Sequence, residues 1–171
     1  MKKYKAEDVL IAREERVEFQ QKLIEKYNLP LISLRVNYPG AEKDNSLTRN
    51  IAEVMKKEII NKFVEQIVYE SHEITAEGPV VTMIIENIAE EIKIKTIDVE
   101  ENHILGRCVD IDVYDNLGNG VSRKQLGYNG RKCFLCGENA QNCLRSRKHE
   151  LEEVTNFINE KYNEYVKKII L

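Results

Sequence analysis

The segment Val109–Val113 contains the residues best suited to chemistry, two aspartates with one residue between them. Side chains alternate between the faces of a β-strand, so a strand here would project Asp110 and Asp112 on one side and its aliphatic residues on the other. Two carboxylates on one strand can share one or two Mg²⁺ ions, which prefer oxygen ligands and bridge to substrate phosphates. The alternative is a half-exposed strand whose polar face lies in water. Candidates for a third carboxylate are Asp98, Glu101 and Asp115.

A second candidate site lies further along the chain, with the spacing Cys133-x2-Cys136-x6-Cys143-x5-His149. Cys-x-x-Cys suits a zinc knuckle, and two further ligands would complete a tetrahedral set. Four protein ligands would make such a zinc site structural. The alternative is that the reduced cysteines pack as small core residues and His149 caps the last helix. A redox-active dithiol is disfavoured, because no thioredoxin-like strand and helix precede the pair.

Positive charge is concentrated around the cysteines, although the net charge of the chain is −3. Residues 123–149 contain seven Lys or Arg and one acid, Glu138, whereas the rest of the chain has 19 basic and 28 acidic residues. A basic face on an acidic protein indicates a specific anionic ligand or an acidic partner, and argues against bulk nucleic-acid binding. Arginine matches phosphate oxygens in pairs, and Tyr128 could stack on a base. A solvated charged face is the alternative.

The elements that would position these residues belong to one α+β domain, residues 1–171. The expected order is α-β-α-β-α-β-β-α, with a mixed or mostly antiparallel sheet flanked by helices and an irregular Cys/His-rich segment before the C-terminal helix. The expected helices span about residues 5–27, 47–69, 88–101 and 149–170. The expected strands span about residues 31–36, 78–85, 105–114 and 121–126.

The connection through Pro39 and Gly40 is another place for an anion, because it leads from a strand to a helix N-terminus. Lys43 and Arg49 would add positive charge there. With 42% hydrophobic and 32% charged residues, the composition is that of a soluble globular protein. Neither a signal peptide nor a membrane-spanning run is expected, and a cytoplasmic location follows from this.

Taken together, these motifs resemble one family, the citrate lyase holo-acyl-carrier-protein synthases, also called apo-citrate lyase phosphoribosyl-dephospho-CoA transferases. Four blocks in the same order carry the resemblance, namely Ala12-Arg13-Glu14-Glu15-Arg16; Pro39-Gly40-x-x-Lys43-Asp44 with Thr48-Arg49; Leu105-Gly106-Arg107-x-x-Asp110-Ile111-Asp112-Val113; and Ser122-Arg123 with Arg131-Lys132-Cys133-x-x-Cys136, Cys143, Arg145 and His149. The chain departs from the pattern at Cys108, where a larger apolar residue is usual, and at residues 128–130, which replace a proline-rich stretch.

The resemblance implies a nucleotidyltransferase-type enzyme that uses 2'-(5''-triphosphoribosyl)-3'-dephospho-CoA as donor. A serine of the acyl-carrier (gamma) subunit of citrate lyase would attack the phosphate on the ribosyl group, form a phosphodiester and release pyrophosphate. Neither nucleic acid nor membrane is an expected partner. Asp110 and Asp112 are the expected catalytic residues and Mg²⁺ ligands. The expected donor-binding residues are Lys43, Arg49, Gly106, Arg107, Arg123, Arg131 and Arg145.

The competing hypothesis is a zinc-stabilised module without catalytic activity. Such a module would bind an acidic protein or RNA through the basic face. It would show salt-dependent affinity and no requirement for Mg²⁺.

Overall fold

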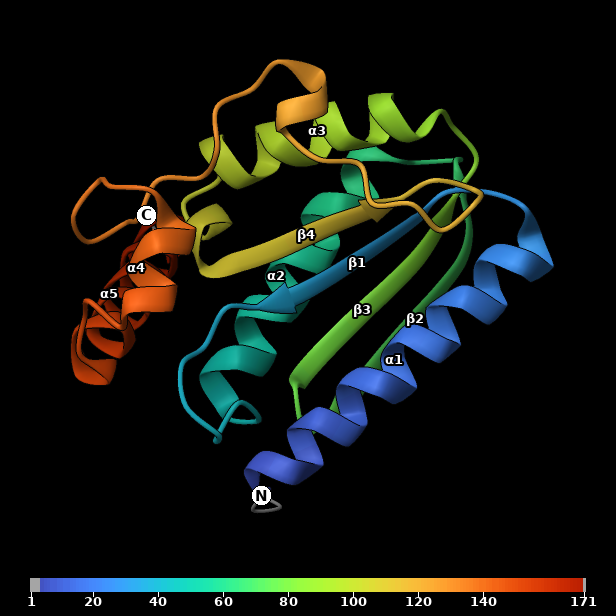
Figure 1. Ribbon diagram of the computed structural model, residues 1–171. Coiled ribbons are helices and arrows are strands. Elements are labelled where there is room, and N and C mark those ends of the chain that lie inside the picture. Colours follow the sequence, from blue (N-terminus) through green and yellow to red (C-terminus); the bar gives the residue numbers. More distant parts are fainter. Residues whose placement is uncertain (1–3, 171) are drawn as a thin grey trace.

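A four-stranded antiparallel sheet with helices on both faces forms the body of the protein (Figure 1). The computed structural model describes residues 4–170. The sheet order is β2-β3-β1-β4, and every pairing is antiparallel. The α+β class is therefore confirmed. The elements are α1 (Ala6–Tyr27), β1 (Leu31–Val36), α2 (Ser46–Lys62), β2 (Ile67–Thr75), β3 (Gly78–Ile85), α3 (Ala89–Asn102), β4 (Val109–Tyr114), α4 (Ala140–Ser146) and α5 (Leu151–Ile170).

The main core lies between the sheet and the helices α2 and α3. β4 shows how the sequence produces it, because Val109, Ile111 and Val113 are at most 1% exposed whereas the two aspartates between them face the other side of the sheet. The apolar residues of α2 recur at helical spacing and are buried against the same face. They are Ile51, Met55 and Ile59, and Phe63 follows at the helix end.

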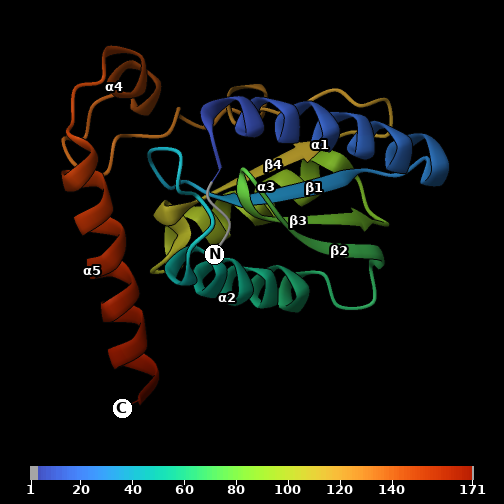
Figure 2. The same ribbon diagram turned by 90° about the horizontal axis from the view of Figure 1, so that it is seen from below.

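The other face of the sheet carries polar residues in register, among them Ser33, Thr82 and Asp112. It is covered only in part by α1 (Figure 2). The C-terminal half of α1 packs Leu23 and Ile24 against the sheet. The part of α1 before Leu23 presents little apolar surface to the sheet, because Leu10 and Val17 are more than half exposed. Gln20 turns inward there and donates a hydrogen bond to Ser33 at 2.8 Å. α1 packs on β3 and β1 and leaves most of β4 outside its cover (Figure 1).

The fourth strand is not where the sequence predicted it. The helix expected over residues 47–69 ends at Lys62, and the chain turns through Glu65 at φ +67° into β2. No Gly, Pro or Asn marks this turn, and the spacing of Ile59, Phe63 and Ile67 continues a helical stripe by coincidence. The strand expected over residues 121–126 is wrong, because Lys124–Leu126 form a 3-10 helix and the chain only makes a bridge before this range, between Tyr114 and Gly120.

The C-terminal helix α5 lies along the edge of the body and extends away from it (Figure 2). Only part of its apolar face is buried, because Ile158 is fully buried whereas Leu151 and Ile169 are more than 60% exposed. Phe157 stacks on Phe134, with ring centroids 4.3 Å apart, and so ties α5 to the Cys/His-rich segment. No helix within residues 4–170 has the length and apolar character needed to cross a membrane.

Candidate active site

Asp110 and Asp112 form the floor of the candidate site, on the polar face of β4. Arg35 of the neighbouring strand β1 donates to Oδ2 of Asp112 at 2.8 Å. Arg131 approaches from the opposite side and donates to Oδ1 of Asp110. Each aspartate therefore has an arginine on one oxygen, while Asp110 Oδ2 and Asp112 Oδ1 have no hydrogen-bond partner within the described residues.

The charge balance at Asp110 favours an additional cation. Burial raises the pKa of Asp110, the charges of Arg131 and Arg35 lower it, and the negative charges of Asp112 and Glu100 raise it again. The net shift is upward although the side chain is 41% exposed, so the two arginines do not fully offset its partial desolvation and the neighbouring acids.

Glu77 binds three arginines beside this floor. It lies between β2 and β3, is 5% exposed, and accepts a 2.7 Å bond from Nε of Arg16. Arg35 and Arg13 lie 3.5 and 3.6 Å from its Oε1. This Glu77 cluster (Glu77 with Arg13, Arg16 and Arg35) connects α1 to Asp112 through Arg35.

The loop that carries Lys43 packs directly against the Glu77 turn. Gly78 has φ +85°, and a Cβ there would lie 2.5 Å from the carbonyl oxygen of Lys43, so only glycine allows this approach. The ammonium group of Lys43 donates to the carbonyl of Tyr38. Burial, and then the neighbouring charge of Arg35, lower the pKa of Lys43. Lys43 therefore belongs to the same cationic region as the Glu77 cluster.

Glu77→Gln is expected to lower the free energy of unfolding by about 3 kcal/mol at pH 7, because it leaves buried arginines without their shared acid. Burial opposes ionisation of Glu77, but the bond and charge of Arg16 and the charges of Arg35 and Arg13 outweigh it and lower its pKa. A lowered folded-state pKa gives stabilisation that is complete above the unfolded value, about 4.3, and is lost as the pH falls through the folded value. Urea denaturation should therefore show the gap between wild type and variant closing below about pH 4; a gap that widens there would contradict this account.

The outer edge of β4 is held by two buried side chains of α3. The ammonium group of Lys93 donates to the carbonyl of Ile111 at 2.8 Å, and the amide of Ile111 donates to Oε1 of Glu100 at 3.0 Å. Both side chains are almost fully buried. Ile111 lies between the two aspartates, so these bonds fix the peptide groups that orient both carboxylates.

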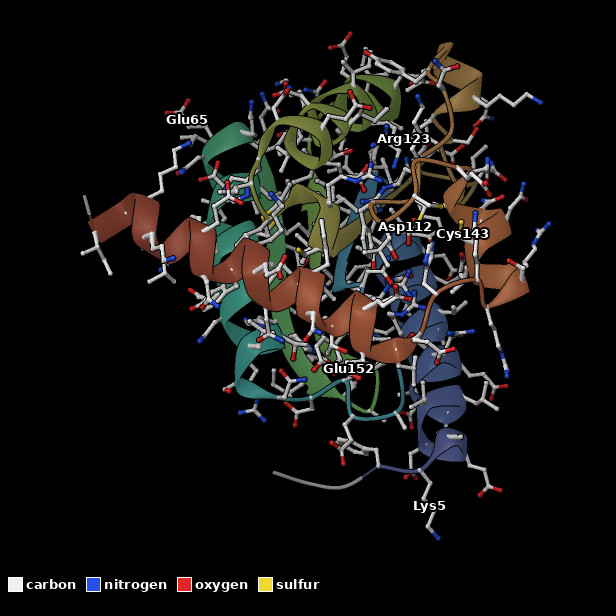
Figure 3. All side chains as sticks on the ribbon, turned by 90° about the vertical axis from the view of Figure 1, so that its left-hand side faces the viewer. Lys5, Glu65, Asp112, Arg123, Cys143 and Glu152 are labelled. Carbon is white, nitrogen blue, oxygen red and sulfur yellow. The ribbon has the colours of Figure 1, made fainter. Side chains whose placement is uncertain are left out.

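Glu100 also anchors the segment that returns over this edge. Arg123 donates to Glu100 at 2.5 Å and to Glu101 at 2.6 Å, and Nη1 of Arg131 lies 3.5 Å from Glu100. Arg131 therefore reaches Asp110 from a position that Glu100 helps to set. Figure 3 shows Asp112 close in projection to Arg123 and Cys143, which come from the segments that follow β4.

Glu100 and Glu101 offer a matched pair of substitutions, because both pair with Arg123 but their side chains are 3% and 49% exposed. Glu100→Gln is expected to lower the free energy of unfolding by about 3 kcal/mol, because it removes a buried charge with two arginine partners. Glu101→Gln should cost less than about 1 kcal/mol, as exposed ion pairs do. Chemical denaturation of both variants measures the difference, and equal costs would show that Glu100 is not the anchor of this segment.

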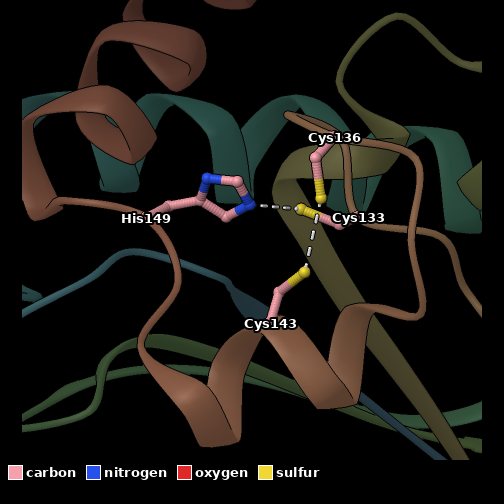
Figure 4. A group of neighbouring side chains, drawn as sticks. All are labelled: Cys133, Cys136, Cys143 and His149. Carbon is pink, nitrogen blue, oxygen red and sulfur yellow. Dashed lines mark hydrogen bonds between the residues drawn. The ribbon is translucent and has the colours of Figure 1, made fainter.

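Cys133, Cys136, Cys143 and His149 gather at one point, with all four candidate ligand atoms within 4.8 Å of one another (Figure 4). We call these four residues the Cys/His cluster. Sγ of Cys133 lies 3.3 Å from Nε2 of His149, and the sulfurs of Cys136 and Cys143 are 3.4 Å apart. That separation is too long for a disulfide, and sulfurs about 2.3 Å from one tetrahedral zinc would be about 3.8 Å apart.

The turn between the first two cysteines has the backbone of a zinc knuckle. Gly137 has φ +73°, and its amide donates to the carbonyl of Cys133 at 2.9 Å. The backbone amide of Glu138 lowers the pKa of Cys136 to about 6. The structure thus brings together the four residues expected to form the site, and the turn at Gly137 allows the chain to reverse beside them.

The Cys/His cluster is linked to the aspartates through a short stretch of backbone. Arg131 stands two residues before Cys133, and its carbonyl accepts from the amide of Ala140, the first residue of α4, at 2.9 Å. Arg107 donates to the carbonyl of Lys132 and ties the same stretch to the beginning of β4. The cluster thereby holds the backbone that carries Arg131.

The structure does not bring every predicted residue to this site. Arg49 makes a two-bond pair with Asp44, and the side chain of Asn45 caps the N-terminus of α2. Arg145 is exposed and has no ion pair within the described residues. Gly106 is buried against α3, and a Cβ there would lie 2.5 Å from two carbonyl oxygens of that helix. Close packing therefore explains the glycine without any contact to a donor.

The candidates for a third carboxylate make other contacts. Asp98 pairs with Lys62, Glu101 pairs with Arg123, and Asp115 accepts hydrogen bonds within its own turn.

Four residues of the site were not predicted from the sequence, namely Arg35, Glu77, Lys93 and Glu100. A weak indication existed for Arg35, the single charged residue in a mostly aliphatic strand, but its register against Asp110 depends on sheet pairing. Glu77 has the appearance of an ordinary turn residue. Lys93 and Glu100 lie on an expected helix whose contact with the edge of β4 no local pattern reveals.

The comparisons with known proteins agree with the motifs assembled at this site. The model of the family "Apo-citrate lyase phosphoribosyl-dephospho-CoA transferase" matches residues 4–165. A protein of that name from Escherichia coli O7:K1 (strain IAI39 / ExPEC) is 33% identical over 152 residues, which cover 87% of this chain and 83% of the relative. Its counterpart in Shigella boydii serotype 18 is 32% identical over the same proportions. The chain therefore belongs to the apo-citrate lyase phosphoribosyl-dephospho-CoA transferase family.

Proposed function

We propose that this protein transfers the phosphoribosyl-dephospho-CoA group from its triphosphoribosyl donor to a serine of the apo acyl-carrier (gamma) subunit of citrate lyase. The observation that carries the proposal is the convergence of all four family blocks on one pair of carboxylates. Arg16 reaches them through Glu77 and Arg35, Lys43 lies against the same turn, and Arg131 bonds to Asp110. The relatives' names supply the donor group and the acceptor.

The reaction would be an in-line displacement at phosphorus. The serine oxygen forms a bond to the phosphorus attached to the ribosyl group, and the bond from that phosphorus to the bridging oxygen breaks. Pyrophosphate leaves with the electron pair. The carboxylate of Asp110 or Asp112 takes the serine proton on a lone pair that neither its arginine nor a bound ion would use, and the arginines on either side stabilise charge on the phosphate oxygens.

Mg²⁺ fits the carboxylate pair. Asp110 and Asp112 project from the same face of β4, each keeps one oxygen free of protein partners, and Asp110 is under-compensated in charge. These free oxygens would hold the ion, which would neutralise charge on the donor phosphates. The protein residues would then orient the donor and hold the serine proton acceptor in place.

Zinc fits the Cys/His cluster. The donor set of three thiolates and one imidazole is typical of structural zinc, and no fifth protein ligand or open face is needed. The metal would fix the stretch from Arg131 to α4 and take no part in the reaction. Its role would be to maintain the position of Arg131 against Asp110.

Pyrophosphate release tests the proposal. Enzyme, donor and apo-carrier together should release pyrophosphate in the presence of Mg²⁺, and omission of the carrier should abolish the release. Rapid donor breakdown without the carrier would indicate a phosphohydrolase instead. Binding of an acidic protein or RNA with strong salt dependence and no pyrophosphate release would favour the non-catalytic alternative.

A further inference from the structure

A basic cavity of about 310 Å³ lies beside the aspartates, between the end of α3 and the segment that leads to the Cys/His cluster. Arg131 lines it and at the same time bonds to Asp110, so the cavity opens next to the reacting groups. Its charged lining consists of four cations and one acid. These residues are Arg107, Arg123, Arg131, Lys132 and Glu101.

Two cations of this cavity have no acidic partner. Within residues 4–170, neither Arg107 nor Lys132 forms an ion pair with a carboxylate. Burial, and then the charges of Arg131 and Arg123, lower the pKa of Arg107. The positive charges of Arg131 and Arg123 therefore repel that of Arg107, and no carboxylate pairs with Arg107 to offset this repulsion. An anion bound in the cavity would offset it.

The same cavity has an aromatic surface. Tyr128 lines it and is 38% exposed, which leaves its ring available to a ligand. The side chain of Asn129 adds amide donors and an acceptor at the same wall. Cations with an aromatic ring beside them suit a nucleotide, because the cations bind the phosphates and the ring stacks on the base.

A second group of cations lies on the opposite side of the aspartates. Arg35 reaches Asp112 from β1, whereas Arg131 reaches Asp110 from the outer edge of β4. Arg13 and Lys43 lie with Arg35 around Glu77, and Arg13 is 57% exposed in a loose 3.6 Å pair. Two separate cationic regions therefore flank one pair of carboxylates.

The proposed donor also has two separate anionic groups, the triphosphate on the second ribose and the diphosphate that joins adenosine to pantetheine. We propose that the basic cavity binds the adenosine diphosphate portion of dephospho-CoA, while the triphosphate lies across the aspartates against Arg13, Arg35 and Lys43. The assignment follows from Tyr128, which gives the cavity a surface for the base. The assignment rests on the proposed function. In this arrangement the cavity would hold the transferred group while pyrophosphate leaves on the other side of the aspartates.

Calorimetric titration with two separate probes, dephospho-CoA and inorganic tripolyphosphate, tests this assignment. Arg107→Gln is expected to weaken dephospho-CoA about tenfold, as loss of one charge-assisted bond does, and to leave tripolyphosphate within about twofold. Tyr128→Leu should weaken dephospho-CoA alone, because it removes the stacking surface without removing charge. Lys43→Gln should weaken tripolyphosphate about tenfold and leave dephospho-CoA nearly unchanged.

Arg147→Gln is the matched control, because it removes one exposed arginine outside the cavity that has no expected role in donor binding. It should change neither affinity beyond the small effect of one distant charge. Equal weakening of both probes by Arg107→Gln, weakening of tripolyphosphate alone, or no binding of dephospho-CoA would overturn the assignment. Failure of the function is distinguishable, since it would appear as wild-type protein that does not load the carrier.

Discussion

Asp112→Asn is expected to reduce turnover by about 1000-fold or more while the protein stays folded, and Asp110→Asn should do the same. The amide retains the size of the carboxylate and can still accept a bond from Arg35 or Arg131. It loses the negative charge that would hold Mg²⁺ and the basicity that would take the serine proton. Initial rates of pyrophosphate release at saturating donor and carrier measure the effect on kcat.

Asp98→Asn provides the control for these variants. Asp98 has a side-chain exposure of 47%, similar to that of Asp112, but pairs with Lys62 at the surface, away from the carboxylate pair. It should retain wild-type turnover. Full activity of both Asp110→Asn and Asp112→Asn would exclude the carboxylate mechanism, whatever the control does. A melting curve for each variant separates lost chemistry from lost structure.

Removal of zinc is expected to have the second large effect. The protein purified without chelator should contain about one zinc per chain, and Cys136→Ser should contain almost none. At free zinc about 1000 times its dissociation constant, the metal adds about 4 kcal/mol to the free energy of unfolding. Chelation should therefore lower the melting temperature, and activity should fall with it, because Arg131 stands two residues before Cys133.

Cys108→Ala separates the Cys/His cluster from cysteines in general. Cys108 is fully buried outside the cluster, and burial raises the pKa of its thiol to about 12, so it is a packing residue. The variant should lose some stability and keep its zinc. A wild-type protein with no zinc, three reactive cluster thiols and a melting temperature unaffected by chelator would show that the cluster is not a metal site.

The features that could be predicted from the sequence depend on residues close to one another along the chain. Asp110 and Asp112 share a face because side chains alternate on any strand, whichever partner the strand has. The four residues of the Cys/His cluster lie within 17 positions, so local turns can bring them together. The Mg²⁺ and zinc assignments themselves stay predictions, because residue types and geometry indicate which metal fits and do not show it bound.

The features that could not be predicted depend on contacts between distant segments. The pair of Arg35 with Asp112 joins residues 77 positions apart, and the pair of Arg16 with Glu77 joins residues 61 apart. β2 was not predicted for a different reason. It is an edge strand with a mostly polar sequence, and the turn that joins it to α2 contains no Gly, Pro or Asn. Pairing with β3 in the folded protein, more than local propensity, decides this element.

The most direct test of the account is the intact mass of the apo acyl-carrier subunit after incubation with this protein, the triphosphoribosyl donor and Mg²⁺. The account predicts that the carrier gains the mass of one phosphoribosyl-dephospho-CoA group, and that a carrier with alanine at the acceptor serine gains nothing. An unchanged carrier mass with folded, metal-loaded enzyme and intact donor would contradict the account.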